Sequence, residues 1–252
     1  MRKGASVPVD DVGEFVRHHL LEDIVEDRRK VSHQYIHIAD HLADSGRAGG
    51  PAHSLAKRSF DTIVAMCGLL VLLPCLLAIA LAIKLTSRGP ILFRQRRYGL
   101  KNKAFVIYKF RTMYSDKSDY SGVLQARLGD QRVTRVGRLL RRSNLDELPQ
   151  LLNVVKGDMS LVGPRPHVFG MLAAGVPYEI LVPNYFERHR VRPGVTGLAQ
   201  ARGFRGSTEG AEPAIARIDL DLKYIQNWSF ALDLRLILET MRTEFLRAGN
   251  GI

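Results

Sequence analysis

An uncharged apolar stretch of about 22 residues, Thr62 to Ile83, constrains this chain more than any other feature of its sequence. A straight helix of that length can cross the hydrocarbon core of a bilayer. Pro74 lies near its middle, where it removes the backbone hydrogen bond to the carbonyl of Leu70 and should kink the helix. The stretch therefore predicts a membrane helix that is broken at Pro74.

Basic residues flank this helix on both sides. A helix that crossed the bilayer once would place one of the two basic groups on the side that the positive-inside rule disfavours. A re-entrant helix, which dips into one leaflet and returns, avoids this, and a one-pass anchor with an ordinary proline kink is the alternative. Asp61 should pair with Lys57 and Arg58 where the helix enters the membrane. The flanking residues are Lys57 and Arg58 before the stretch, and Lys84, Arg88, Arg94, Arg96 and Arg97 after it.

The chain has a formal net charge of +12, which is unevenly distributed. Residues 1–50 contain 7 basic and 9 acidic side chains, so the positive excess lies in the rest of the chain. This excess indicates an anionic partner, which could be nucleic acid, an anionic membrane surface or a phosphorylated substrate. Cys67 and Cys75 lie inside the apolar stretch and indicate neither a disulfide nor a zinc site.

Three regions follow from these patterns. Residues 1–50 combine near-helical apolar spacing with a glycine-rich end, which predicts a soluble amphipathic N-terminal extension and a linker. Its three histidines, His33, His37 and His41, share one helix face, but a polar face explains them better than a metal site because no second ligand cluster accompanies them. Residues 51–88 hold the membrane helix, and residues 89–252 form the remaining domain.

The last region alternates short elements with loops. Residues 91–99 and 104–110 are two β-like runs that most simply form a hairpin. Arg135 to Arg142 should form a basic amphipathic helix, suited to an anionic membrane or to nucleic acid. Helical spacing returns from Ile215 to Leu246, and the glycine- and proline-containing segments before it should be loops.

Two adjacent carboxylates, Asp146 and Glu147, precede Pro149 and a helix-like run. Since proline is tolerated in the first turn of a helix, both carboxylates should lie at the helix N-terminus, where free N–H groups can also bind phosphate. An acidic first turn of an ordinary helix would explain an isolated pair. Here the neighbouring cations favour a phosphate site: Arg135, Arg138, Arg141 and Arg142 precede the pair, and Arg165 follows it.

Further groups suited to phosphate lie elsewhere in the chain. Lys109, Arg111 and Thr112 cluster at the end of the predicted hairpin, and Arg165 lies between two prolines. Prolines on both sides lower the entropy cost of holding a guanidinium group on a phosphate. Each of these residues could also be ordinary solvated surface.

In their order along the chain, from about Lys57 to Thr240, these motifs resemble the bacterial sugar transferases, the monotopic polyprenyl-phosphate phosphoglycosyl transferases. Each motif alone is weak, but the collinear set is highly specific. The motifs are Lys57-Arg58-x-x-Asp61, the proline-broken apolar helix, Gly89-Pro90, Phe93-x-Gln95-x-Arg97-x-Gly99, Lys109-Phe110-Arg111-Thr112-Met113, Leu145-Asp146-Glu147-Leu148-Pro149-Gln150, Gly163-Pro164-Arg165-Pro166 and Arg192-Pro193-Gly194-Val195-Thr196-Gly197.

The resemblance implies a mainly α-helical monotopic membrane protein with a small β-hairpin, a re-entrant helix and a cytoplasmic catalytic domain over residues 89–252. It implies transfer of a hexose 1-phosphate from a UDP-sugar to undecaprenyl phosphate, with release of UMP, as the first membrane step of exopolysaccharide or glycan assembly. Asp146 matches the nucleophile that forms a phosphosugar-aspartyl intermediate, and Glu147 matches its partner carboxylate. Mg²⁺ is implied as cofactor, and which of the two carboxylates binds it is open.

Other residues also match positions in the motifs of this family, but the resemblance defines their roles less well. Arg141 and Arg165 match phosphate-binding positions, whereas Lys109, Arg111, Thr112 and Asp221 match motif positions that could bind phosphate or support the site. Asn144 stands where the family pattern has Ser or Thr, and we expect it to cap the helix equally well.

The resemblance also implies a cellular setting. It places the chain at the bacterial cytoplasmic (inner) membrane, with the catalytic domain on the cytoplasmic face, and it leaves the oligomeric state open between monomer and homodimer. The residues that follow Ala201 are most similar to members that transfer glucose 1-phosphate, and galactose 1-phosphate is the alternative. The polyprenol length is not fixed by the sequence.

Two other functions compete with this interpretation. The basic charge would suit a membrane-tethered nucleic-acid-binding protein, but no helix-turn-helix, zinc or RNP-type signature is present, so we expect no nucleic-acid partner. A noncatalytic membrane adaptor would need no functional Asp146.

Overall fold

The computed structural model describes residues 50–51, 54–116, 130–204 and 210–246 of the chain. The predicted N-terminal extension and its histidine face therefore lie outside the described residues.

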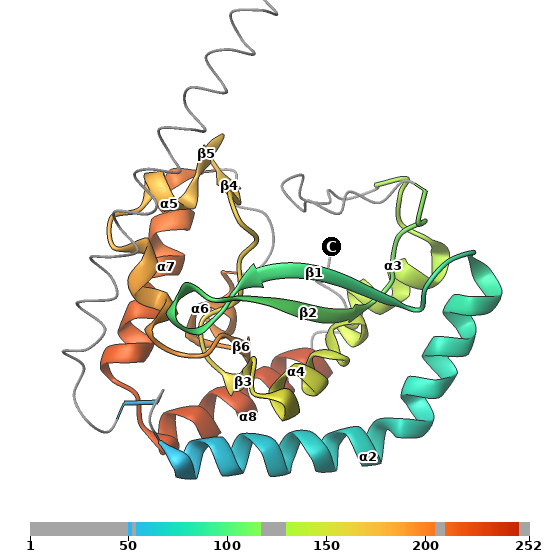
Figure 1. Ribbon diagram of the computed structural model, residues 1–252, viewed down its shortest axis with the longest axis horizontal. Helices are drawn as coiled ribbons and strands as arrows, with labels where there is room; N and C mark the ends of the chain where they lie inside the picture. The colour runs from blue at the N-terminus through green and yellow to red at the C-terminus, as the bar shows by residue number, and fades with distance from the viewer. Residues whose placement is uncertain (1–49, 52–53, 117–129, 205–209, 247–252) are drawn as a thin grey trace, which may run out of the picture. The chain divides into compact units, whose positions relative to one another are not determined.

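The first half of the described chain contains one long helix, a hairpin and two short helices separated by a 3₁₀ turn (Figure 1). These elements are α2 (Leu55–Thr86), β1 (Leu92–Tyr98), η1 (Leu100–Asn102), β2 (Ala104–Phe110), α3 (Arg135–Arg142), η2 (Leu145–Glu147) and α4 (Gln150–Lys156).

The second half contains short strands and turns followed by two longer helices. They are β3 (Ser160–Val162), β4 (Leu172–Ala173), β5 (Val176–Pro177), α5 (Tyr178–Leu181), η3 (Tyr185–Arg190), β6 (Gly194–Thr196), α6 (Leu198–Ala201), α7 (Ala211–Gln226) and α8 (Phe230–Leu246). The predictions of a hairpin, of the helix at Arg135–Arg142 and of closing helices are confirmed, and the described chain is mainly helical.

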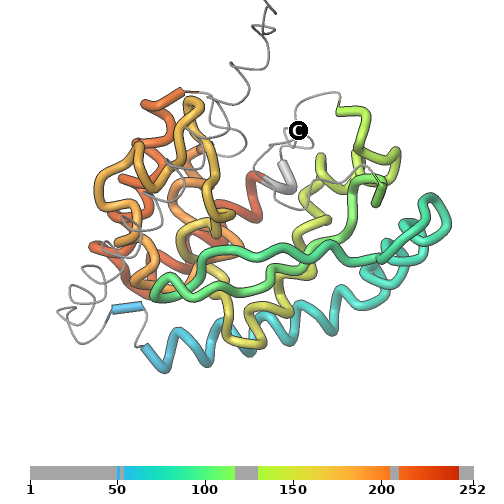
Figure 2. Tube along the Cα trace, turned by 45° about the horizontal axis from the view of Figure 1, so that its top comes forward, coloured from blue at the N-terminus to red at the C-terminus, as the bar shows by residue number. Residues whose placement is uncertain are grey.

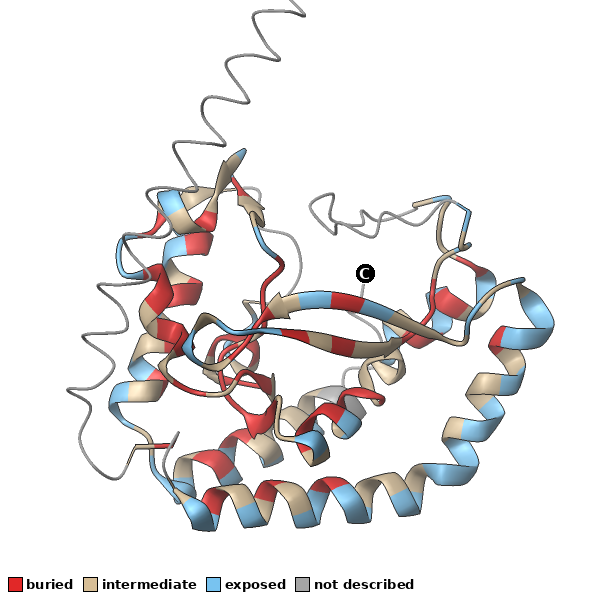
Figure 3. Cartoon of the chain, viewed as in Figure 1, coloured by how far each residue is buried: buried red, intermediate tan, exposed pale blue. Residues whose placement is uncertain are grey.

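The apolar stretch forms one helix, α2, that includes Pro74. Figure 1 shows that α2 changes direction along its length. Pro74 lies inside the helix, and a break at this proline stays a prediction. Most of α2 is exposed or only partly buried (Figure 3), including Leu70 and Val71 at 70% and 78% exposure. Its length and composition suit a membrane helix, and its re-entry into one leaflet stays a prediction.

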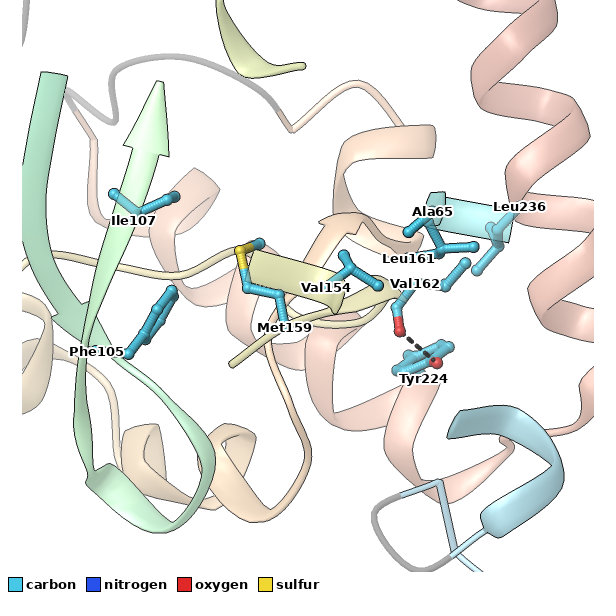
Figure 4. Packing of buried hydrophobic residues seen from close by; sticks show 9 residues of the cluster. All are labelled: Ala65, Phe105, Ile107, Val154, Met159, Leu161, Val162, Tyr224 and Leu236. Atoms are coloured by element: carbon cyan, nitrogen blue, oxygen red, sulfur yellow. Dashed lines mark hydrogen bonds between the residues drawn. The ribbon is translucent and has the colours of Figure 1, made fainter. Parts of the chain in front are cut away.

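The main core joins α2 to the rest of the domain. Ala65 of α2 packs in one cluster with Val154 of α4, Val162 of β3 and Leu236 of α8 (Figure 4). Tyr224 of α7 belongs to the same cluster, and its hydroxyl donates a hydrogen bond to the Val162 carbonyl at 3.0 Å. The first half of α2 is therefore a structural part of the domain.

Two segments predicted as loops contain a small parallel sheet. β3 pairs with β6 in parallel, with Ser160 opposite Gly194 and Val162 opposite Thr196. The backbones approach so closely that a Cβ atom on Gly194 would overlap the backbone of Gly163. Strands of three residues are too short to show an alternating pattern, so the sequence indicated only turns.

A buried charged cluster ties the start of α2 to α8. The Lys57 ammonium lies 2.7 Å from Asp233 and 3.5 Å from Asp61, and Asp61 also accepts a hydrogen bond from Ser160 at 2.5 Å. Both Lys57 and Asp61 are nearly fully buried in the protein. The expected Lys57–Asp61 pair is therefore present, but it lies in the protein interior.

Arg58, which was also expected to pair with Asp61, has other partners. It lies near the C-terminal end of α4, where its guanidinium group donates to the carbonyls of Val154 and Val155 at 2.6 and 3.0 Å. Carbonyls at a helix C-terminus lack intrahelical partners, so they attract a cation. Arg58 therefore fastens α2 to α4, the helix that follows the two carboxylates.

We expect Asp233→Asn to lower the apparent melting temperature of detergent-solubilised protein by about 10 °C, because Lys57 would lose a buried partner. The matched control is Arg235→Gln on the same helix, which breaks a largely exposed pair with Glu239 and should change the melting temperature by no more than about 2 °C. Equal melting curves for Asp233→Asn and the control would show that the buried cluster contributes little to stability.

Candidate active site

Asp146 and Glu147 lie in the 3₁₀ turn η2, directly before α4. Pro149 caps α4, so the α-helix itself begins after both carboxylates. The prediction of a single helix beginning upstream of Pro149 is therefore corrected to a 3₁₀ turn followed by an α-helix. The carboxylates still lie at the start of a helical segment.

Asn144 does not act as the expected capping residue. It adopts a left-handed conformation with φ of 53°, and its side chain makes no capping hydrogen bond. Asn tolerates this conformation better than most residues, which accounts for its presence at the sharp turn between α3 and η2.

The Glu147 carboxylate is held by two cations. The Lys109 ammonium of β2 lies 2.6 Å from its Oε1 atom, and the Arg165 guanidinium contacts both carboxylate oxygens at 2.6 and 3.1 Å. Burial would raise the pKa of Glu147, but the charges of Arg165 and Lys109 outweigh it and hold that pKa well below its ordinary value. Glu147 is therefore ionised and fixed in position.

The neighbouring carboxylate, Asp146, has a different environment. Among the described residues, no hydrogen bond or ion pair engages the Asp146 side chain. Burial, followed by the adjacent Glu147 charge, raises the pKa of Asp146 to about 6, although Lys109, Arg141 and Arg165 each act to lower it. At neutral pH Asp146 is therefore mostly ionised and free to react.

Arg141 approaches from α3. Its Nε atom donates to the Thr112 hydroxyl at 2.8 Å, and its charge acts on Asp146. Thr112 follows β2, so this contact fixes Arg141 relative to the hairpin that also carries Lys109. The structure thus brings together five of the predicted site residues: Asp146, Glu147, Arg141, Lys109 and Arg165, with Thr112 as a support.

Asp221 supports the site through a residue that sequence reasoning missed. Arg188 of η3 is fully buried, and its guanidinium group contacts Asp221 at 2.6 and 3.0 Å. The same group donates to the carbonyl of Arg165 at 2.6 Å. The pair therefore fixes the backbone that carries Arg165. The sequence offered no signal for this role beyond the position of Asp221 in a motif.

Arg97 of β1 also holds this loop. Its guanidinium group donates to the Pro166 carbonyl at 3.1 Å and to the Gln95 side chain at 2.5 Å. Burial, together with the nearby Arg165 charge, lowers the pKa of Arg97 to about 10, and the guanidinium group stays cationic at neutral pH. Arg97 belonged to a recognised motif but not to the predicted site.

Arg111 has different neighbours from the other predicted phosphate ligands. It donates to the backbone and side chain of Ser87 at 2.9 and 3.0 Å, to the Arg88 carbonyl, and to the Ser115 hydroxyl at 2.6 Å. These contacts fasten the end of the hairpin to the end of α2. Its role in phosphate binding stays a prediction.

Asp146 is the carboxylate that would hold a metal ion shared with the substrate, because both Glu147 oxygens already accept hydrogen bonds from Lys109 or Arg165. No group of three or more His, Cys, Asp or Glu side chains suited to a metal occurs within residues 50–51, 54–116, 130–204 and 210–246. Mg²⁺ is commonly bound by one or two carboxylates together with substrate phosphates. Asp146 has unoccupied oxygens and a raised pKa, so a nearby cation would stabilise its charged form.

The chain matches known proteins over this whole region. The family model for bacterial sugar transferases matches residues 52–247. The exopolysaccharide production protein PSS of Rhizobium leguminosarum bv. phaseoli is 54% identical over 77% of this chain and 97% of its own length. A UDP-glucose:undecaprenyl-phosphate glucose-1-phosphate transferase of Caulobacter vibrioides is 49% identical over 81% of this chain and 79% of its own length.

A third relative has a different sugar in its name. It is the UDP-N-acetylgalactosamine-undecaprenyl-phosphate N-acetylgalactosaminephosphotransferase of Aeromonas hydrophila, 40% identical over 81% of this chain. This chain spans about half, 48%, of that relative's length. With the family model and these identities, the chain is an enzyme of the bacterial sugar transferase family.

Proposed function

We propose that the chain transfers a hexose 1-phosphate, glucose 1-phosphate in the first place, from a UDP-sugar to undecaprenyl phosphate. The observation that carries the proposal is the contrast between two adjacent carboxylates. Glu147 is fixed by Lys109 and Arg165, whereas Asp146 is ionised and has no fixed partner in the described part of the chain. A carboxylate of the second kind is a competent nucleophile that needs no proton removal.

In the first step, an Asp146 carboxylate oxygen attacks the sugar-bearing phosphorus of the UDP-sugar. A bond forms between that oxygen and phosphorus, the bond to the bridging oxygen breaks, and UMP leaves with the electron pair. Arg141 and Arg165 lie close enough to influence the Asp146 charge, so they can also neutralise the diphosphate that approaches it.

In the second step, a phosphate oxygen of undecaprenyl phosphate attacks the same phosphorus. The bond to Asp146 breaks, the carboxylate is restored, and a polyprenyl diphosphosugar is released. Mg²⁺, when bound at Asp146 and the substrate phosphates, would offset their negative charge and stabilise the departing phosphate.

The sugar and the setting complete the proposal. The Caulobacter relative is named for glucose 1-phosphate and the Aeromonas relative for N-acetylgalactosamine, so members of one family differ in the sugar. Galactose 1-phosphate is the second candidate from the sequence. The proposed setting is the cytoplasmic face of the bacterial inner membrane, where α2 dips into one leaflet.

The first test measures UMP release with a panel of UDP-sugars, with and without undecaprenyl phosphate, in Mg²⁺ and after its removal by chelation. We expect lipid-dependent turnover with one preferred sugar, and a loss of at least about a thousandfold in Asp146→Asn, because the amide cannot form the intermediate. The control Asp219→Asn changes an exposed carboxylate of α7 and should keep wild-type turnover.

Full UMP release by Asp146→Asn would refute the proposed nucleophile. No release from any UDP-sugar by folded wild-type protein would favour the noncatalytic adaptor.

The second test concerns the topology of α2. In a background without Cys67 and Cys75, single cysteines at Leu55 and Leu85 would be treated in intact cells with a membrane-impermeant maleimide. Both positions are exposed at the ends of α2, and re-entry predicts that neither is labelled from outside. A spanning helix would expose one of them.

The same assay tests Pro74. We expect Pro74→Ala to straighten α2 and to make one of the two end cysteines reactive from outside, because the backbone hydrogen bond to Leu70 would be restored. Unchanged protection of both ends would mean that the domain contacts, and not the proline, enforce re-entry.

A further inference from the structure

A cavity of about 750 Å³ lies where α2 passes the catalytic domain. Its walls come from α2, from the start of β1, from the end of β2 and from the first part of α4. Figure 2 shows α2 passing along α4 and then turning toward the start of β1. The cavity volume falls within the range of about 300–1,000 Å³ that is typical of pockets for small ligands.

As far as the described residues form it, the cavity wall is apolar apart from two arginines and contains no acidic residue. Leu76, Leu77 and Ala80 line it from α2, while Arg94 and Arg111 provide the charges of this described wall. A wall of this kind suits a molecule with a long hydrocarbon part and an anionic end.

One of these arginines has an unused donor. The Nε atom of Arg111 is buried and has no hydrogen-bond partner in the described part of the chain, although its other nitrogens hold Ser87, Arg88 and Ser115. Arg94 is exposed, and the central carbon of its guanidinium group lies 5.9 Å from the centroid of the Tyr108 ring. Both groups line the cavity and can therefore contribute positive charge to an anion bound in it.

Two residues of the cavity wall are also close in sequence to residues of the candidate active site. Thr112, which accepts a hydrogen bond from Arg141, directly follows Arg111. Pro149, another wall residue, is three residues after Asp146. A phosphate near Arg111 would therefore be close in sequence to the residues that surround the nucleophile.

We propose that this cavity binds the isoprenoid chain of the acceptor polyprenyl phosphate, with its phosphate toward Arg94 and Arg111. The inference rests on the proposed function and adds the place where the lipid substrate is held. A single branched hydrocarbon chain with a phosphate monoester matches an apolar cavity with two arginines in its wall. A phospholipid has two acyl chains and a bulkier headgroup, and it is the occupant that the test must exclude.

The binding test uses a polyprenyl phosphate with a diazirine in its chain, photolysed with wild-type protein in vesicles and mapped by mass spectrometry. We expect labels on wall residues such as Leu76 and Leu77, which excess unlabelled undecaprenyl phosphate should displace. A diazirine phosphatidylglycerol should label outward residues such as Leu70 and Val71 instead. Equal labelling of the wall by both probes, with no displacement, would overturn the inference.

The kinetic test fills the cavity from α2. Leu77→Trp places a larger side chain at the wall, and Leu81→Trp is the matched control, since Leu77 and Leu81 are exposed to similar extents, 62% and 59%, and only Leu77 lines the cavity. We expect Leu77→Trp to raise the KM for undecaprenyl phosphate about tenfold, equivalent to about 1.4 kcal/mol, and the control to leave it unchanged. Ala80→Phe provides a second filling variant.

The readout separates this inference from the proposed function. UMP release in a single turnover without lipid reports the first step, and it should be unchanged in Leu77→Trp. An unchanged KM in both filling variants would refute the cavity as the lipid site while leaving the transferase intact. If wild-type protein released no UMP, the proposed function would fail, and the displacement of the diazirine label would still decide the lipid site.

Discussion

Two adjacent carboxylates in a partly buried site repel one another, and the rest of the site follows from how that repulsion is met. Lys109 and Arg165 neutralise Glu147, which keeps its charge and its position. Burial, and after it the charge of Glu147, raises the pKa of Asp146 to about 6. Equal neutralisation of both residues would have bound Asp146, the proposed nucleophile, in an ion pair as well.

The supporting structure is arranged to hold these two cations. Lys109 lies on β2, which is paired along its length with β1. Arg165 lies in a loop whose carbonyls are held by Arg188 and Arg97. Because Asp221 neutralises the buried Arg188, the loop is positioned from the domain interior. These supports come from segments that are distant in sequence, and no single motif contains them.

The sequence predicted the elements that are long or that have a clear local pattern of apolar and charged residues. The apolar helix, the hairpin and the helix of Arg135–Arg142 were all predicted, as was the grouping of Asp146 with nearby cations. The sequence-based predictions were wrong where contacts between residues distant in sequence determine the position of a side chain. Arg58 was expected to pair with Asp61, but it donates to carbonyls near the C-terminal end of α4. Asn144 was expected to cap a helix, but the chain reversal there requires its backbone conformation.

The proposed reaction needs a water-soluble donor and a membrane-embedded acceptor to reach one phosphorus atom. A carboxylate on an independent soluble domain would meet the lipid phosphate only when the domain happened to lie against the bilayer. Here Arg58 binds the first half of α2 to the C-terminal carbonyls of α4, whose preceding turn carries Asp146. α2 and Asp146 therefore belong to one packed unit, and under the proposed function the depth of α2 in the bilayer would fix the height of Asp146 above it.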